Sequence, residues 1–261
     1  MSYLGPILAR KRREIARRAR HLAVAEPGLR RGGAPPDLAR PAGARPRVIA
    51  EVKFRSPSAG AIRPWAPGEA VRVARGYAAG GADAISVLCD GPGFGGSPLA
   101  LRRVARAVAP VPVLFKEFVL DALQLDLAVR CGASLVLLLV NALDDATLRD
   151  LVRGCAARGL APLVEAASEQ ELERALATDA RHVGINARDL RTFALDPRRA
   201  AALVEKIPKD RVAVYMSGVQ SADELRAAAA SRADAVLVGS GLMAAPDPGA
   251  RLAAWLEELG R

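Results

Sequence analysis

Short runs of β-branched and aliphatic residues recur along the chain at a spacing of about 25 to 30 residues. Stretches rich in Ala, Leu and Arg separate them. Two of these, SEQELERALAT and SADELRAAAAS, open with a Ser followed by acidic residues, which is typical of a capped helix start. The apolar runs predict eight strands, at Val48–Lys53, Ala84–Leu88, Val111–Phe115, Leu135–Leu139, Ala161–Glu165, His182–Ile185, Val212–Tyr215 and Ala235–Val238.

Eight alternating strand and helix units predict an α/β fold, a (β/α)8 TIM barrel over residues 48–261, because this fold typically takes about 250 residues. Residues 1–47 are then expected to form an N-terminal helix and a connection packed on the barrel, within a single domain overall. The connection, Gly28–Arg47, is dense in Gly, Pro and Arg. A doubly wound open sheet is the alternative, but no GxGxxG follows the first strand.

The chain has 261 residues and is 51% hydrophobic, enough to bury a full-sized core. Its longest apolar run, Leu135–Val140, is far too short to cross a bilayer, and its first residues lack a signal-peptide pattern. These features predict a cytoplasmic protein.

Cysteine and histidine usage predicts no metal site. Cys89, Cys131 and Cys155 are well separated and form no CxxC pair, so we expect buried thiols rather than a disulfide framework. His21 and His182 are far apart and have no nearby set of ligand partners. We therefore expect both histidines to serve at the surface or in packing.

The net charge of +10 favours anionic partners, whether nucleic acid, an acidic membrane or a phosphorylated metabolite. Much of the excess is arginine in the first fifty residues, as in Ala9–Arg20, where an apolar stripe predicts a helix with a solvated basic face. Aromatic residues make up only 4% and do not interleave with this run, which disfavours single-stranded nucleic acid. The helical pattern fits a monomer or a weak homodimer equally. The stripe consists of Leu4, Ile7, Leu8, Ile15 and Leu22.

Polar residues occupy the carboxyl ends of several predicted strands, where TIM barrels carry their chemistry. Glu51 and Lys53 have the phase of an inward face, and Lys116 follows the third strand. An unpaired buried charge costs several kcal/mol, about 3–5 when a partner is lost, so convergence of such residues indicates a site. The others are Glu165 on the fifth strand and Asn186 and Arg188 after the sixth.

Small residues follow the last two predicted strands, as Ser217-Gly218 and Gly239-Ser240-Gly241. Such residues allow backbone N–H groups to approach a phosphate, and barrels commonly bind one here. Ordinary turn chemistry explains either pair alone. Together with the cationic strand ends, they favour a phosphorylated substrate.

The strings IAEVKFRSPSAG, FGGS, PVLFKEF, LVEAASEQELERAL, GINARDLRTF, SGV and VGSGLM occur in this order over nearly the whole chain. In this the chain resembles the indole-3-glycerol phosphate synthase family. The resemblance implies a ribulose-phosphate-binding type of TIM barrel and a carboxy-lyase of tryptophan biosynthesis. Such enzymes close the indole ring of 1-(2-carboxyphenylamino)-1-deoxyribulose 5-phosphate with loss of carbon dioxide and water, without a metal or organic cofactor.

The resemblance also implies roles for matching residues. Lys116 would be the general acid at the ribulose carbonyl, its pKa lowered by neighbouring cations. Glu51 and Glu165 would transfer protons in the dehydration, and which is acid and which is base stays open. The implied catalytic residues are Glu51, Lys53, Lys116, Glu165 and Asn186; the substrate-binding residues are Ser56, Phe94, Phe118, Arg188 and Met216; and the phosphate-binding residues are Arg55, Ser217, Gly218, Gly239 and Ser240.

Two positions depart from the family pattern. Met216 stands where the family usually has a glutamate, and Glu117 where it usually has an aspartate. Without that glutamate, the five charged residues Glu51, Lys53, Lys116, Glu165 and Arg188 predict a formal charge of about +1 for the site. A weakened or repurposed relative acting on a similar aryl-amino sugar phosphate is thus an alternative.

Two further alternatives are less favoured. Phosphoribosyl anthranilate isomerase, a similar barrel, relies on a cysteine in its first strand, and this chain has none there. A basic RNA- or membrane-associated barrel without catalytic activity leaves the inward charges unexplained. It predicts salt-sensitive binding that is indifferent to substitution of Lys116 or Glu165.

Overall fold

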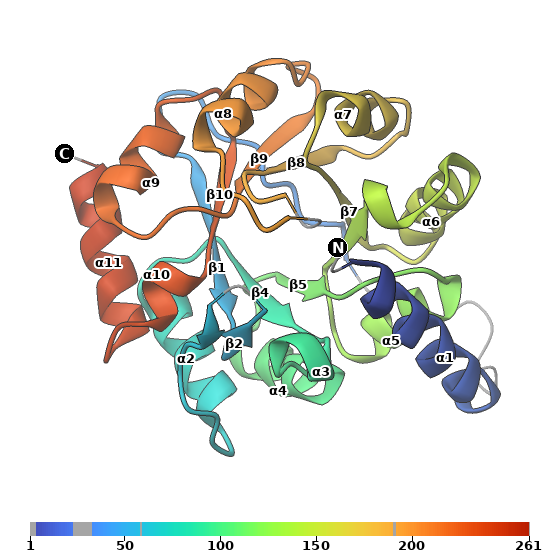
Figure 1. The fold of residues 1–261 in the computed structure, drawn as a ribbon. Helices are drawn as coiled ribbons and strands as arrows, with labels where there is room; N and C mark the ends of the chain where they lie inside the picture. Colours follow the sequence, from blue (N-terminus) through green and yellow to red (C-terminus); the bar gives the residue numbers. More distant parts are fainter. Residues whose placement is uncertain (1–3, 23–32, 58, 190–191, 261) are drawn as a thin grey trace.

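The computed structural model describes residues 4–22, 33–57, 59–189 and 192–260, and its main sheet is a closed parallel barrel (Figure 1). Each strand pairs with the next one around the barrel, and β1 pairs with both β4 and β10. The predicted (β/α)8 barrel is therefore confirmed. Its strands are β1 (Arg47–Val52), β4 (Ala84–Leu88), β5 (Val113–Lys116), β6 (Leu135–Leu139), β7 (Ala161–Ala166), β8 (His182–Asn186), β9 (Val212–Met216) and β10 (Ala235–Val238).

Helices surround the barrel on the outside (Figure 1). The two predicted helix caps are confirmed: the Ser168 hydroxyl accepts from the backbone N–H of Glu171, and that of Ser221 from Glu224. The longer helices are α1 (Leu4–Leu22), α2 (Glu69–Ala79), α4 (Pro98–Val108), α5 (Ala122–Arg130), α6 (Asp145–Ala157), α7 (Glu169–Leu176), α8 (Pro197–Glu205), α9 (Ala222–Ala229) and α11 (Pro248–Leu259). Of the predicted connection Gly28–Arg47, the part before Gly33 lies outside the described residues.

Several short elements follow the strand ends and were not predicted. Two to four residues are too few to show a hydrophobic period, so the sequence gives no sign of them. They shape the loops over the carboxyl end of the barrel. They are the antiparallel pair β2 (Arg55–Ser56) and β3 (Gly60–Ala61), the helices α3 (Gly91–Phe94) and α10 (Ser240–Met243), and the 3-10 turn η1 (Val140–Ala142).

β5 begins at Val113, two residues later than predicted. Proline has no N–H to donate to a ladder, so the backbone of Pro112 can only accept. Its carbonyl still accepts a hydrogen bond of 2.9 Å from the N–H of Ile85, which leads the chain into the barrel. The N–H of Val111 donates to the carbonyl of Val108 in the preceding turn, so pairing with β4 begins at Val113, opposite Ile85.

Helix α1 lies beside α5 at the barrel periphery (Figure 1). Leu4 is buried, and Ile7 and Leu8 pack against the core. Arg12 is exposed, as the predicted basic face requires. That expectation is wrong for Lys11, which is only 2% exposed.

Buried side chains fill the barrel and the layer beneath the helices. The predicted buried thiols are confirmed, since Cys89, Cys131 and Cys155 are all free and buried. Burial raises the pKa of the Cys155 thiol to about 12. Over the described ranges, no helix combines the length and the apolar character that crossing a bilayer requires.

His182 packs at the amino end of β8, as one of the two predicted uses of histidine. The backbone N–H of Leu38 donates to its Nε2 over 3.2 Å, so the ring accepts there in its neutral form. Burial, and also nearby Arg181, lower the pKa of His182 to about 4, against the opposing effect of Asp37 and Asp234. Protonation of His182 would put an N–H on Nε2, so that it would face the N–H of Leu38 with no acceptor between them.

We predict that His182 makes the fold sensitive to acid. A histidine whose pKa falls from 6.5 in the unfolded chain to about 4 in the folded one stabilises the fold fully above pH 6.5 and progressively less towards pH 4. The loss amounts to roughly 3 kcal/mol. His182→Gln keeps an acceptor but does not titrate. Urea unfolding of both proteins from pH 7.5 to 4.5 should show the extra loss only in the parent, and parallel curves would contradict this.

Candidate active site

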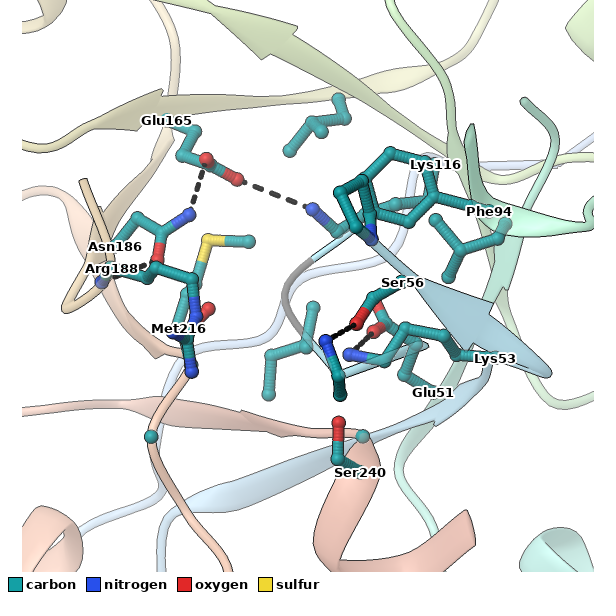
Figure 2. Close-up of a pocket in the computed structure, with 18 of the residues that line it drawn as sticks. Glu51, Lys53, Ser56, Phe94, Lys116, Glu165, Asn186, Arg188, Met216 and Ser240 are labelled. Carbon is teal, nitrogen blue, oxygen red and sulfur yellow. Dashed lines mark hydrogen bonds and ion pairs between the residues drawn. The ribbon is translucent and has the colours of Figure 1, made fainter. Parts of the chain in front are cut away.

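A pocket of about 450 Å³ opens at the carboxyl end of the barrel, within the size range of small-molecule sites (Figure 2). The structure brings together there every site residue predicted from the sequence except Arg55. Those residues are Glu51, Lys53, Ser56, Phe94, Lys116, Phe118, Glu165, Asn186, Arg188, Met216, Ser217, Gly218, Gly239 and Ser240.

Lys116, Glu165 and Asn186 form one polar group in this pocket, built from the ends of β5, β7 and β8 (Figure 2). The Lys116 ammonium lies 3.3 Å from Glu165 Oε2, and Asn186 Nδ2 donates to Oε1 over 2.8 Å. Both oxygens of a carboxylate that is almost completely buried therefore have partners.

The expected lowering of the Lys116 pKa is wrong for the unliganded protein. Burial favours the neutral amine, but the carboxylates of Glu165 and Glu51 outweigh it and raise the pKa of Lys116 above its usual value. The sequence reasoning counted neighbouring cations, whereas the nearest charges are anions. Lys116 is thus an ammonium at neutral pH and has a proton to donate.

Glu51, Lys53 and Ser86 form a second polar group at the end of β1 and the middle of β4. Glu51 Oε1 lies 3.1 Å from the Lys53 ammonium, and the Ser86 hydroxyl donates to Oε2 over 3.2 Å. Burial opposes ionisation of Glu51, but Lys53, Lys116 and the hydrogen bond from Ser86 outweigh it and hold its pKa below the usual range. Glu51 is therefore a carboxylate at neutral pH and can accept a proton.

The ends of β9 and β10 border the same pocket with small residues. Ser217 and Gly218 have φ angles of 70° and 87°, in the left-handed region that favours glycine. A Cβ at Gly239 would lie 2.8 Å from Glu51 Oε1, so the second polar group requires glycine there. Ser240 is the first residue of α10, and the N–H groups in the first turn of a helix have no partner within the helix.

Phe94 and Phe118 form an aromatic wall of the pocket. Their ring centroids are 6.1 Å apart and the rings are tilted by 42°. This is within the range of favourable aromatic pairs. The two residues come from α3 and from the loop after β5, so their pairing fixes those two loops relative to each other.

Met216 ends β9 opposite Asn186 of β8, and its thioether faces the pocket (Figure 2). Its side chain is buried against Gly184, where an added Cβ would lie 2.5 Å from the sulfur. A thioether accepts hydrogen bonds only weakly. The end of β9 consequently offers the pocket no strong hydrogen-bond acceptor from this side chain.

Two of the predicted ligand side chains contact protein instead. The Arg55 guanidinium donates to the carbonyl of Pro92, which joins the β2–β3 turn to α3, and Arg55 does not line the pocket. Arg188 lines the pocket, but its Nη1 donates to the carbonyl of Phe193 over 2.9 Å. Its backbone N–H also bonds to the side-chain oxygen of Asn186.

The pocket contains two further carboxylates, Asp90, which the sequence reasoning missed, and Glu117, which it noted as a departure from the family pattern but left out of the charge of the site. Asp90 follows Leu88 of β4 by two residues, so the alternation that identified Lys116 could have found it. In its described lining, four carboxylates (Glu51, Asp90, Glu117 and Glu165) face three cations (Lys53, Lys116 and Arg188), a formal charge of −1. The predicted formal charge of +1 is therefore wrong.

Comparison with known proteins gives consistent matches. A family model described as indole-3-glycerol phosphate synthase matches residues 7–254. The indole-3-glycerol phosphate synthase of Opitutus terrae is 43% identical over 259 residues, covering 95% of this chain and 96% of its own. That of Micrococcus luteus is 46% identical over 197 residues, covering 76% of this chain and 72% of its own.

Solved structures agree on the fold. Two structures of 3-hexulose-6-phosphate synthase, the second from Salmonella typhimurium, superpose with TM-scores of 0.62 and 0.61 at 22% and 16% identity. Each covers 82% of this chain, and the alignments span 97% and 99% of those chains. At such identities these two structures support the TIM-barrel fold alone. The family model and the Opitutus terrae relative, which match nearly the full length, show that the chain belongs to the indole-3-glycerol phosphate synthase family.

Proposed function

We propose that the chain is an indole-3-glycerol phosphate synthase, a carboxy-lyase of tryptophan biosynthesis acting on 1-(2-carboxyphenylamino)-1-deoxyribulose 5-phosphate. The observation that carries this is the placement of two lysine–carboxylate pairs in one pocket, between an aromatic wall and a border of small residues. The substrate has matching parts, an aryl carboxylate at one end and a phosphate at the other. Its reacting carbonyl lies between them.

The first chemical step needs an acid beside the carbonyl oxygen. Lys116 supplies the proton as the aryl carbon attacks, because its raised pKa keeps it an ammonium until the oxygen becomes basic. Glu165 and Asn186 hold the ammonium and its partner in place. Loss of carbon dioxide then restores the aromatic ring.

The dehydration that follows needs a base as well as an acid. Glu51 is the base that takes the proton, since its pKa below the usual range leaves it ionised. Lys53 beside it first offsets the charge of the substrate carboxylate and, once carbon dioxide has left, donates the proton with which the hydroxyl departs as water. Phe94 and Phe118 receive the aryl ring. The backbone at Ser217, Gly218, Gly239 and Ser240 receives the phosphate.

We predict that Lys116→Met lowers kcat by on the order of 10²–10⁴-fold, the usual contribution of a general acid. Formation of indole glycerol phosphate is followed by its fluorescence, and circular dichroism verifies the fold. The matched control is Lys209→Met, at an exposed lysine, which should keep the parent rate. Absence of turnover by the parent protein, or full activity of Lys116→Met, would contradict the proposal.

We further predict that Met216→Glu raises kcat/KM by about tenfold, equivalent to about 1.4 kcal/mol of barrier. A carboxylate at the end of β9 would accept hydrogen bonds that a thioether cannot. Met216→Gln has a similar size without charge and should gain less. If the glutamate brings no gain, the thioether at the end of β9 favours a different aryl-amino sugar phosphate as the natural substrate.

A further inference from the structure

We propose that Lys11 of α1 is a positioning residue for the aryl end of the pocket, because its ammonium binds the two carboxylates that carry the aromatic wall. This inference rests on the proposed function only for the nature of the ligand. Lys11 lies outside the barrel strands and does not line the pocket itself.

The three donors of the Lys11 ammonium have three partners. Its Nζ lies 3.0 Å from Glu117 Oε2, 3.2 Å from Asp90 Oδ1 and 2.9 Å from Glu14 Oε2. Arg10, one residue earlier, also binds Asp90 Oδ1 over 2.8 Å. A lysine that is 2% exposed and bound in this way is fixed in position, unlike the exposed arginines of the same helix.

Each of the two pocket carboxylates holds the loop of one aromatic residue. Asp90 is the N-cap of α3 and accepts from the N–H of Gly93, next to Phe94. Glu117 Oε1 accepts from the N–H of Phe118 over 2.8 Å. Lys11 therefore connects, through one atom, the supports of both rings of the aromatic wall.

Charge gives Lys11 a second effect on the ligand. The described lining of the pocket has a formal charge of −1, and Lys11 brings the group to zero. Burial raises the pKa of Glu117 to about 7, although Lys11 and the Phe118 amide oppose this. Without Lys11, Asp90 keeps only Arg10 and the Glu117 carboxyl loses its cation, so the pocket repels the carboxylate of an aryl ligand more strongly wherever Glu117 is ionised.

Lys11 has a sequence signal that is specific to its position. It follows Leu4 by seven residues, Ile7 by four and Leu8 by three, so it lies within the apolar stripe of α1. A cation at a stripe position is expected to have a buried anionic partner.

The test uses one probe for each end of the pocket. N-methylanthranilate, a fluorescent aryl carboxylate, reports on the aryl end, and inorganic phosphate, measured on its own, reports on the phosphate end. Lys11→Met should weaken binding of the aryl carboxylate by about tenfold or more and that of phosphate by less than about twofold. Lys11→Arg, which keeps the charge, should stay within about threefold of the parent for both. The matched control Arg12→Gln, on an exposed face of α1, should bind both as the parent does.

A second substitution tests the charge directly. Loss of Lys11 raises the pKa of Glu117 further, so Glu117→Gln added to Lys11→Met should recover at least about threefold of the lost aryl affinity at pH 9, where that carboxyl ionises, and less at pH 6, where it is neutral. Equal weakening of both probes, unchanged aryl binding by a folded Lys11→Met, an equal loss in Arg12→Gln, or no aryl binding by the parent would overturn the proposal. If Lys11→Met does not fold, Lys11→Gln, which keeps a donor, must show the same difference between probes.

These outcomes are distinguishable from failure of the proposed function. A parent protein that binds both probes without forming indole glycerol phosphate would refute the synthase activity and leave the role of Lys11 open to this same test. A parent that turns over substrate, with no difference between the probes in Lys11→Met, would refute the role of Lys11 alone.

Discussion

The site depends on one constraint, that a carboxylate removed from water must lie beside a cation and accept hydrogen bonds. Glu51 and Glu165 are almost completely buried, and each has a lysine about one hydrogen-bond length away. Because neighbouring parallel strands end at one level, the barrel brings β1, β5 and β7 to a common pocket. The fold thus stabilises ion pairs at buried positions where an isolated charge would be strongly destabilising.

The same constraint extends outwards to the N-terminal helix. Asp90 and Glu117 add negative charge next to the aromatic wall, and Lys11 is the buried cation that faces both. A helix outside the barrel thereby helps set the electrostatics of a pocket built by the strands. The basic character of α1 has two parts, an exposed arginine face and one lysine that belongs to the structure of the site.

Prediction from the sequence was correct where a repeating pattern along the chain shows which side chains face inwards. Strand alternation placed Glu51 and Lys53 correctly, because a two-residue period states which side chains face inwards. It could not place Arg55, since the two-residue strand β2 has no period and its side chain turns to Pro92. Nor could it find the partners of Lys11, because Glu117 lies more than a hundred residues away along the chain. The sign of the Lys116 pKa shift depended on distances to Glu165 and Glu51 that only the fold provides.

The most direct test of this account is a crystal structure with a non-reactive reduced analogue of the aryl-amino sugar phosphate bound. The account predicts the phosphate against the backbone of Ser217–Gly218 and Gly239–Ser240, the aryl ring against Phe94 and Phe118, and the Lys116 ammonium within hydrogen-bond distance of the oxygen that replaces the carbonyl. An analogue bound with its phosphate at the aromatic wall, or with Lys116 turned away from that oxygen, would contradict it.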